Sequence, residues 1–550
     1  MALRYASRAD EAYDFPLTIG HLLDAALATS AEQEIVYRDR LTMTYRDLRG
    51  RIGRLARVLS DHGAGEGTTV AVMDWDSHRY LEAYFAVPMM GAVLMTVNVR
   101  LPTAQIQYTL NHAKTEVIVV HRDFLPLLDA VRDTLTGVKA IIVIDEDEDE
   151  DEDSTGAALP AYAAGEYEAL LAQVEEPFPF RPIDENAIAT TFYTTGTTGD
   201  PKGVEYSHRQ IVLLTLASNA PFGTTRRPGF GINDVYMPLT PMFHVHAWCL
   251  PYVATMIGVK QVYPGKYEPD MICRLRRDHG VTFSHCVPTI LQMVLGAAAE
   301  SEVDLAGWTM IIGGSALTEA TWKDATARGM NVNVGYGMSE TGPMLTQSRA
   351  AQYRDESEPL DPHVMTMAGV TVPLVSARVV DEDMNDVPHD GVARGVLVVR
   401  APWLTQGYVG NADASAQLWR GGWMHTQDIA TIDAMGRVQI RDRLKDVIKS
   451  GGEWIPSLEI EDLIAGTRGV AEVAVIGVPD PHWGERPAAV IVASGDATPT
   501  LETVNEPLQQ AIAKGRLSRY AAIERMELRD ALPRTSVGKI DKKRIRADIS

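Results

Sequence analysis

Short apolar runs that alternate with helical patterns dominate the first part of this chain. The runs Val70–Met73, Val117–Val120 and Ala140–Ile144 have the length and the β-branched composition of buried strands. An apolar pattern near Arg79–Pro88, between the first two runs, is typical of a helix. Strands and helices that alternate at this spacing indicate a buried, largely parallel sheet. The sequence therefore predicts an α/β fold.

The chain has 550 residues, which is too long for one typical domain. Further runs with strand character occur at residues 188–192, 235–237, 261–263, 310–312, 332–334, 473–478 and 488–492. The character of the sequence changes at the polar stretch Arg441–Asp446, and enough residues follow it for a small domain. We therefore expect a large multi-sheet N-terminal domain over residues 1–442 and a small α+β C-terminal domain over residues 443–550.

The formal net charge of −22 argues against nucleic acid as a partner, because duplex binding depends on Lys and Arg side chains that neutralise phosphates. It does not exclude a small polyanion, which local backbone amides and a few cations can bind. Isolated cysteines at Cys249, Cys273 and Cys286 fit a reducing compartment. No signal peptide is visible over Met1–Asp14, and the most apolar run, Leu81–Val97, is too short for a membrane span. We expect a cytoplasmic protein without a transmembrane segment.

The run Asp145–Asp153 consists of nine successive acidic residues. A metal site or a site for a basic partner is one interpretation of such a run. We favour a solvated, mobile loop, because adjacent like charges repel each other and bury nothing.

The segment Tyr193–Gly203 combines hydroxyls, glycines and a lysine directly after a strand-like run. Glycines allow the backbone to approach a ligand, hydroxyls add donors, and a lysine supplies a point charge for phosphate oxygens. Asp200 and Pro201 interrupt the spacing of a Walker A motif. We interpret the segment as a triphosphate-binding loop; the alternative is a flexible hairpin turn. The candidate phosphate-binding residues are Thr194, Thr195, Gly196, Thr197, Thr198 and Lys202.

A second glycine-containing segment, Gly335–Gly342, follows another strand-like run. Two of its glycines flank Tyr336, an aromatic ring suited to lie against a purine. Ser339 and Glu340 then offer a hydroxyl for phosphate and a carboxylate for Mg²⁺, which prefers oxygen ligands. The composition predicts a nucleotide and magnesium site.

These two segments resemble motifs of the adenylate-forming superfamily, which includes acyl-CoA synthetases, carrier-protein adenylation domains and luciferases. The resemblance extends from about Leu17 to Arg546, with the later motifs in the expected order. Closest in pattern are bacterial fatty acyl-CoA synthetases and methylmercaptopropionate-CoA ligases. The resemblance implies a two-step enzyme that uses ATP, Mg²⁺ and coenzyme A. A carboxylate and ATP form an acyl-adenylate and pyrophosphate, and CoA then takes the acyl group and releases AMP.

The resemblance also assigns the nucleotide site. Tyr336 and its glycines contact adenine, and Ser339 contacts the α-phosphate. Glu340 binds the magnesium, while Asp428 and Arg443 contact the ribose. The ATP-binding residues beyond the phosphate loop are thus Gly314, Gly335, Tyr336, Gly337, Ser339, Asp428 and Arg443.

Lys539 lies in the string Pro533–Ile540, where a solvated surface lysine is the default interpretation. The catalytic lysine of the superfamily occupies this Pro-x-Thr-x-x-Gly-Lys context, so the resemblance implies that Lys539 is catalytic. A cation at the bridging oxygens stabilises the negative charge that accumulates as a carboxylate attacks the α-phosphate.

For the second step, the resemblance implies a mobile C-terminal domain with a hinge at about residues 443–446. The alternative is a charged interdomain linker followed by a simple β-turn. Hinge residues need only absorb a change in φ and ψ, so they have little chemical signature. The residues implied for the hinge and for CoA are Lys445, Lys449, Gly451, Gly452 and Trp454.

The pair His244 and His246 invites a metal interpretation. The spacing lacks a third ligand nearby, and the only other candidate cluster is Cys286 beside His285, so we do not favour zinc.

Instead, the resemblance implies that Pro241–Trp248 begins the helix beside an acyl channel. His244 then lies near the substrate carboxylate and the α-phosphate as a catalytic residue, and Trp248 gates the channel. Gly313 and Gly314 line the acyl pocket. No charged residue stands out here, which favours an uncharged hydrophobic tail.

Several functions stay open. Medium- to long-chain fatty acids are the first choice of substrate, followed by methylmercaptopropionate and arylalkanoic acids. An adenylation enzyme that loads a carrier protein is a second possibility, although we expect no carrier region after Ser550. A non-enzymatic ATP-binding module is a third, and Lys539 speaks against it because binding alone does not require that lysine. Bacterial relatives often form dimers, so a homodimer is one option.

Overall fold

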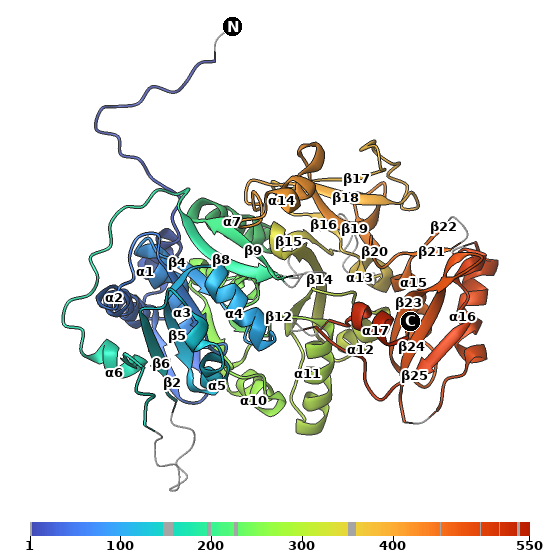
Figure 1. Cartoon of the computed structure of the whole chain (residues 1–550), viewed down its shortest axis with the longest axis horizontal. Coiled ribbons are helices and arrows are strands. Elements are labelled where there is room, and N and C mark those ends of the chain that lie inside the picture. Colours follow the sequence, from blue (N-terminus) through green and yellow to red (C-terminus); the bar gives the residue numbers. More distant parts are fainter. Residues whose placement is uncertain are drawn as a thin grey trace.

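The computed structural model describes residues 3–146, 158–194, 200–224, 229–349, 359–450, 453–495, 497–515, 517–535 and 539–549. Two large sheets and a small antiparallel sheet form the body of the molecule, and a smaller unit with its own sheet lies at the C-terminal end (Figure 1). The predicted α/β fold with a large multi-sheet body and a smaller C-terminal α+β part is confirmed.

The first sheet has the strand order β7-β6-β5-β3-β4-β8-β9 and is parallel except for its last pair. Its strands are β3 (Thr69–Met73), β4 (Val93–Thr96), β5 (Thr115–His121), β6 (Ala140–Ile144), β7 (Gly165–Glu166), β8 (Ile188–Thr194) and β9 (Lys202–Ser207). The three apolar runs of the sequence form β3, β5 and β6, and the predicted helix is α3 (His78–Met89). These strands are buried on both faces, as their continuous apolar composition predicts.

The second sheet has the order β16-β15-β14-β13-β12-β10-β11-β1-β2. Its strands are β1 (Glu34–Tyr37), β2 (Leu41–Thr44), β10 (Val235–Pro238), β11 (Lys260–Tyr263), β12 (Phe283–Cys286), β13 (Thr309–Ile312), β14 (Asn331–Met338), β15 (Gly342–Gln347) and β16 (Val370–Thr371). The strands from β14 to β1 run parallel, so their carboxyl ends share one edge. Parallel α/β sheets bind ligands at this edge.

The small antiparallel sheet and the C-terminal sheet follow in the chain. The first consists of β17 (Ser376–Val380), β18 (Gly395–Arg400), β19 (Met424–Ile432) and β20 (Val438–Arg443). The second contains β21 (Ile448–Ser450), β22 (Glu453–Ile455), β23 (Val470–Asp480), β24 (Gly484–Ala493) and β25 (Arg525–Leu528). The C-terminal sheet packs its own apolar core, which is separate from the core of the body.

Helices cover the sheets (Figure 1). Besides α3 they are α1 (Gly20–Ser30), α2 (Tyr45–Asp61), α4 (Thr103–His112), α5 (Leu125–Asp129), α6 (Tyr167–Ala172), α7 (His208–Thr224), α8 (Val245–Trp248), α9 (Leu250–Ile257), α10 (Pro269–His279), α11 (Pro288–Ser301), α12 (Glu319–Ala327), α13 (Pro362–Thr366), α14 (Ala412–Leu418), α15 (Ser457–Ala465), α16 (Leu501–Ala513) and α17 (Lys542–Ile549). Within the described ranges, no helix is both long and apolar enough to cross a membrane.

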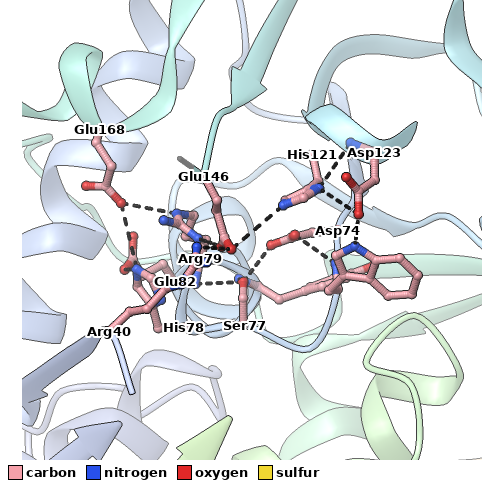
Figure 2. A network of polar contacts seen from close by, with 12 residues as sticks. Arg40, Asp74, Ser77, His78, Arg79, Glu82, His121, Asp123, Glu146 and Glu168 are labelled. Atoms are coloured by element: carbon pink, nitrogen blue, oxygen red, sulfur yellow. Dashed lines mark hydrogen bonds and ion pairs between the residues drawn. The ribbon is translucent and has the colours of Figure 1, made fainter. Parts of the chain in front are cut away.

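A network of ion pairs lies at the carboxyl ends of β3, β5 and β6 (Figure 2). The Glu146 side chain is 7% exposed and is paired with Arg79, and the half-buried Asp145 is paired with Arg122. The prediction that the acidic run buries nothing is therefore wrong at Glu146. Arginines on neighbouring elements supply the opposite charge that a buried carboxylate requires. Residues 147–153 of the run lie outside the described residues.

Candidate active site

The predicted phosphate loop connects β8 to β9, which pair as a hairpin with Thr194 opposite Lys202. Thr195, Gly196, Thr197 and Thr198 lie outside the described residues. The Lys202 ammonium stands 4.6 Å from the centre of the Tyr408 ring. The Tyr408 hydroxyl in turn donates a hydrogen bond of 2.7 Å to Glu340 Oε1. The base of the phosphate loop and the predicted magnesium ligand therefore meet at one tyrosine.

Two buried aromatic side chains hydrogen-bond to the backbone of the turn that carries Ser339 and Glu340. The Tyr206 hydroxyl donates to the Ser339 carbonyl and accepts the amide of Gly342, both at 2.7 Å. The Trp403 indole donates to the Thr341 carbonyl at 2.8 Å. Because Tyr206 lies on β9, the strand after the phosphate loop also fixes the position of this turn.

Glu340 is suited to bind a hard cation. The residue is 7% exposed, and its Oε1 accepts the Tyr408 hydroxyl. A carboxylate in this position fits Mg²⁺, which takes one or two protein carboxylates beside phosphate oxygens and water.

Tyr336 and Asp428 form a direct pair. The Tyr336 hydroxyl donates to Asp428 Oδ2 at 2.6 Å, and Arg443 Nε lies 3.3 Å from Asp428 Oδ1. Burial raises the pKa of the Asp428 carboxyl, and the Arg443 charge opposes that shift. Gln427, next to Asp428, has a left-handed φ of 63°, a conformation that favours glycine.

Lys539 reaches the same region from the C-terminal unit. Its amide donates to the Thr535 hydroxyl at 3.2 Å, which fixes the start of the segment before α17. Burial lowers the pKa of the Lys539 ammonium to about 8, and the nearby Arg443 charge adds to the shift. The Asp428 and Glu340 charges act in the opposite direction. The neighbourhood of Lys539 thus contains the predicted ribose and magnesium carboxylates.

Gly313 and Gly314 follow β13 and form a floor for two large side chains. A Cβ built on Gly313 would lie 3.0 Å from the Trp248 ring. A Cβ built on Gly314 would lie 3.5 Å from Lys539 Cε and 4.0 Å from the Trp248 ring. Trp248 itself is 7% exposed, and its ring centre lies 5.2 Å from that of His285. The glycines therefore bring the predicted gate next to the predicted catalytic lysine.

Gly335 and Gly337 on β14 also lie where little space is left. A Cβ on Gly337 would approach the Pro343 carbonyl oxygen to 2.4 Å, and one on Gly335 would meet Ile311 at 3.3 Å. Gly337 therefore requires glycine for packing, whereas a side chain at position 335 would need the Ile311 side chain to shift by a few tenths of an ångström.

The segment that carries His244 differs from the expectation that it begins a regular helix. Residues Val245–Cys249 all have φ between 46° and 58°, so the labelled helix α8 is a left-handed turn, and the right-handed helix starts at Leu250 in α9. A left-handed conformation costs about 1–2 kcal/mol for each residue with a Cβ. The turn therefore depends on contacts from its surroundings.

The two histidines of the segment point to different partners. Burial lowers the pKa of the His244 imidazole to about 3, with the Lys539 and Arg100 charges as further causes, so the ring is neutral. His246 Nε2 lies 2.7 Å from the Thr190 hydroxyl, and the His246 ring packs against Phe192. His246 is therefore a core residue of the first sheet.

The residues implied for the hinge and for CoA lie on the C-terminal unit. Lys445 is exposed directly after β20. Lys449 and Trp454 face each other across the β21–β22 hairpin, with the Lys449 ammonium 5.6 Å from the centre of the Trp454 ring. Gly451 and Gly452 lie outside the described residues.

Sequence reasoning missed Tyr206, Trp403 and Tyr408. Tyr408 carries a weak signal, since Gly407-Tyr408-Val409-Gly410 repeats the glycine-flanked tyrosine of Gly335-Tyr336-Gly337. Tyr206 and Trp403 carry none, because a buried aromatic residue is ordinary in any sheet.

Comparisons with known proteins cover almost the whole chain. The family model "AMP-binding enzyme" matches residues 23–409, and "AMP-binding enzyme C-terminal domain" matches residues 459–539. A long-chain-fatty-acid–CoA ligase of Thermus thermophilus is 39% identical, over 97% of this chain and 96% of the relative. A 3-methylmercaptopropionyl-CoA ligase of Ruegeria lacuscaerulensis is 35% identical, over 96% and 97%. The solved structure of ATP-bound MatB from Rhodopseudomonas palustris matches with a TM-score of 0.81 at 25% identity, over 97% of this chain and 99% of that one.

Proposed function

The chain belongs to the AMP-binding enzyme family and is an AMP-forming acyl-CoA ligase, and we propose that it activates medium- to long-chain fatty acids. The observation that best supports this proposal is the placement of Lys539 from the C-terminal unit against the Gly313–Gly314 turn, beside Trp248. The Lys539 cation thus lies near the carboxylates that we assign to ribose and Mg²⁺, and beside the Trp248 gate.

In the first step, a carboxylate oxygen of the acid attacks the α-phosphorus of ATP. A P–O bond to the acid forms, the bond to the bridging oxygen breaks, and pyrophosphate leaves. Lys539 stabilises the charge that develops between the two anions. Burial and the neighbouring cations keep the His244 imidazole neutral. The neutral ring donates a hydrogen bond near the substrate carboxylate and the α-phosphate and adds no charge of its own.

Residues from several elements hold the nucleotide. Tyr336 lies against adenine, Asp428 accepts from the ribose hydroxyls with Arg443 beside it, and Ser339 contacts the α-phosphate. Glu340 holds Mg²⁺, which neutralises phosphate charge when it is bound. Thr194 and Lys202, at the two ends of the phosphate loop, act on the β- and γ-phosphates.

In the second step, the CoA thiolate attacks the acyl carbonyl, the thioester forms and AMP leaves with the electron pair of the broken C–O bond. Lys539 packs against the Gly313–Gly314 turn, so we infer that the thiol requires a different arrangement. The unit formed by residues 443–550 rotates about Lys445, and the β21–β22 hairpin with Lys449 and Trp454 then borders the pantetheine path. The domain boundary after residue 442 is part of this proposal.

The choice of acid rests on the apolar surroundings of Trp248. The His285 ring lies against Trp248, and the rings of Tyr236, Phe230 and Phe283 pack in succession behind His285. Methylmercaptopropionate is the second candidate, because the Ruegeria relative is named for it. Arylalkanoic acids and a carrier protein as acyl acceptor are the remaining alternatives. We also propose a cytoplasmic location and a homodimer.

A substrate panel tests this function. Purified protein with ATP and Mg²⁺ is given straight-chain acids of increasing length, methylmercaptopropionate and phenylalkanoic acids, and CoA-thioester formation is measured. The proposal predicts the highest kcat/KM for medium or long chains. A phosphopantetheinyl carrier protein replaces CoA in a parallel series, and a preference for that acceptor would reassign the second step. Pyrophosphate exchange in the absence of any acceptor separates an enzyme from an ATP-binding module.

A further inference from the structure

The left-handed turn that carries His244 is anchored by the opposite sheet. Pro241–Cys249 follows β10 of the second sheet. The Met242 amide donates to Asp76 Oδ1 at 2.8 Å, and Asp76 lies in the connection between β3 of the first sheet and α3. Asp76 is 4% exposed. A buried carboxylate thus joins the carboxyl edges of the two large sheets.

Asp76 has a second donor on the other side. The Tyr267 hydroxyl donates to Asp76 Oδ2, and the Gly265 amide donates to the Asp76 backbone carbonyl at 2.9 Å. Both partners follow β11, the neighbour of β10 in the second sheet. Two donors to one carboxylate are the arrangement that makes burial of that group tolerable. Burial raises the pKa of Asp76 to about 7, against the effect of these hydrogen bonds.

Two further side chains, one on α3 and one on β4, hydrogen-bond to the same short stretch of backbone. The Tyr84 hydroxyl donates to the Met242 carbonyl, and the Thr96 hydroxyl donates to the Phe243 carbonyl at 3.0 Å. The Met242 amide and the carbonyls of Met242 and Phe243 all lie just before His244. A strained turn persists only where surrounding contacts over-determine it. These side chains supply such contacts exactly at the entry to Val245–Cys249, so they set where His244 stands.

We propose that Asp76 is a positioning residue for the adenylation step: through the Met242 amide it fixes the backbone that places the His244 imidazole. This inference rests on the proposed function, because it presumes the role of His244 near the acid and the α-phosphate. Asp76 touches neither substrate. Its effect passes through one backbone hydrogen bond.

The test compares Asp76→Ala with Asp76→Asn. Alanine removes the acceptor of the Met242 amide, whereas asparagine keeps an acceptor oxygen and offers an amide to the Tyr267 oxygen. We expect D76A to lower kcat/KM for the acid about 100-fold, the loss that a small misplacement of a catalytic group produces, with the KM for ATP unchanged. D76N should retain most of the wild-type kcat/KM for the acid. Thr69→Val is the matched control, since Thr69 is buried at the other end of β3 and donates to the Ala113 carbonyl at 2.9 Å.

Two further measurements separate positioning from general destabilisation. Hydrogen exchange of a peptide spanning residues 241–249 should rise in D76A and stay at the wild-type level in T69V. In a His244→Ala background, D76A should add little further loss, because both changes act through one group. If D76A does not fold, Thr96→Val replaces it, with a smaller loss and faster exchange in the same peptide.

The proposal is overturned if D76A and T69V have the same kcat/KM for the acid and the same hydrogen exchange over residues 241–249. It is also overturned if the double variant D76A/H244A loses the product of the two single losses in kcat/KM. It is also overturned if D76N loses as much as D76A. Failure of the wild-type protein to form any acyl-adenylate would count against the proposed function instead, and the exchange measurement would still show whether Asp76 holds this backbone.

Discussion

The Lys539 side chain lies against Gly314: a Cβ built on Gly314 would stand 3.5 Å from Lys539 Cε. Gly314 has a left-handed φ of 80°, and the same Cβ would lie 3.0 Å from Val287 Cγ1. The turn therefore has no room for a side chain between the lysine and the wall of the site.

We predict that Gly314→Ala lowers the rate of acyl-adenylate formation by about tenfold or more, because a side chain at this left-handed φ, pressed against Val287, strains the turn on which Lys539 packs. Pyrophosphate exchange measures the effect. Gly296→Ala is the control, since Gly296 lies in α11 with open space at its Cβ position. An unchanged exchange rate in G314A would show that the contact has no role.

The lowered pKa of Lys539 gives a pH prediction. The ammonium acts as a cation, so activity is present below the pKa and is lost as pH rises through it. With the pKa of Lys539 at about 8 in the free enzyme, kcat/KM for the acid should fall above pH ~8, well below the ordinary range of a lysine. Lys539→Arg should retain its residual activity to higher pH, because a guanidinium stays charged. If kcat/KM for the acid falls at the same pH in K539R as in the wild-type protein, a group other than Lys539 causes the fall.

The hydrogen bond between Tyr336 and Asp428 predicts a nucleotide effect. Tyr336→Phe removes one donor from a buried carboxylate, a loss of about 1–1.5 kcal/mol, and should raise the KM for ATP about tenfold. The control is Tyr162→Phe, which removes a comparable tyrosine–aspartate bond, to Asp129, on the exposed surface. Equal KM values in the two variants would contradict the assignment of Asp428 to the ribose.

The sequence alone points to several of these residues as candidates for the site, because each candidate stands with its characteristic neighbours in one short motif. Glu340, Asp428 and Lys539 each stand in such a motif. The strands at 140–144 and 310–312 were equally accessible, since fully buried parallel strands are continuous apolar runs.

The rest depends on contacts between distant segments. Tyr408 joins Lys202 to Glu340, yet nothing in its local sequence says which loop it meets. The burial of Glu146 depends on Arg79 from another element, so a rule about adjacent like charges could not foresee it. The left-handed turn at Val245–Cys249 has no glycine to announce it, because tertiary contacts override local preference there.

Trp248 predicts a change in selectivity. Trp248→Ala should widen acceptance of longer acids, because the indole fills space beside Gly313 and Gly314. The same change removes a buried aromatic ring and should lower stability by about 3–5 kcal/mol. Thermal unfolding and a chain-length series of kcat/KM values measure the two effects. An unchanged length profile in a folded W248A protein would refute the gate.

Glu340 predicts a metal effect. Chelation of Mg²⁺ should abolish pyrophosphate exchange, and Glu340→Gln should raise the Mg²⁺ concentration needed for half-maximal rate, because an amide is a weaker ligand than a carboxylate. A titration of Mg²⁺ at fixed ATP gives this value. If Glu340→Gln needs the same Mg²⁺ concentration as the wild-type protein for half-maximal rate, other groups bind the metal.

The central claim is that Lys539 supplies the cation for adenylation and has no part in thioester formation. Lys539→Ala should lower pyrophosphate exchange by about 10²–10³-fold, the range for one stabilising group, while supplied acyl-adenylate is converted to acyl-CoA at a nearly normal rate. Measuring both half-reactions on the same K539A preparation tests this most directly. Loss of adenylation alone is the predicted result, and equal loss of both half-reactions would contradict the account.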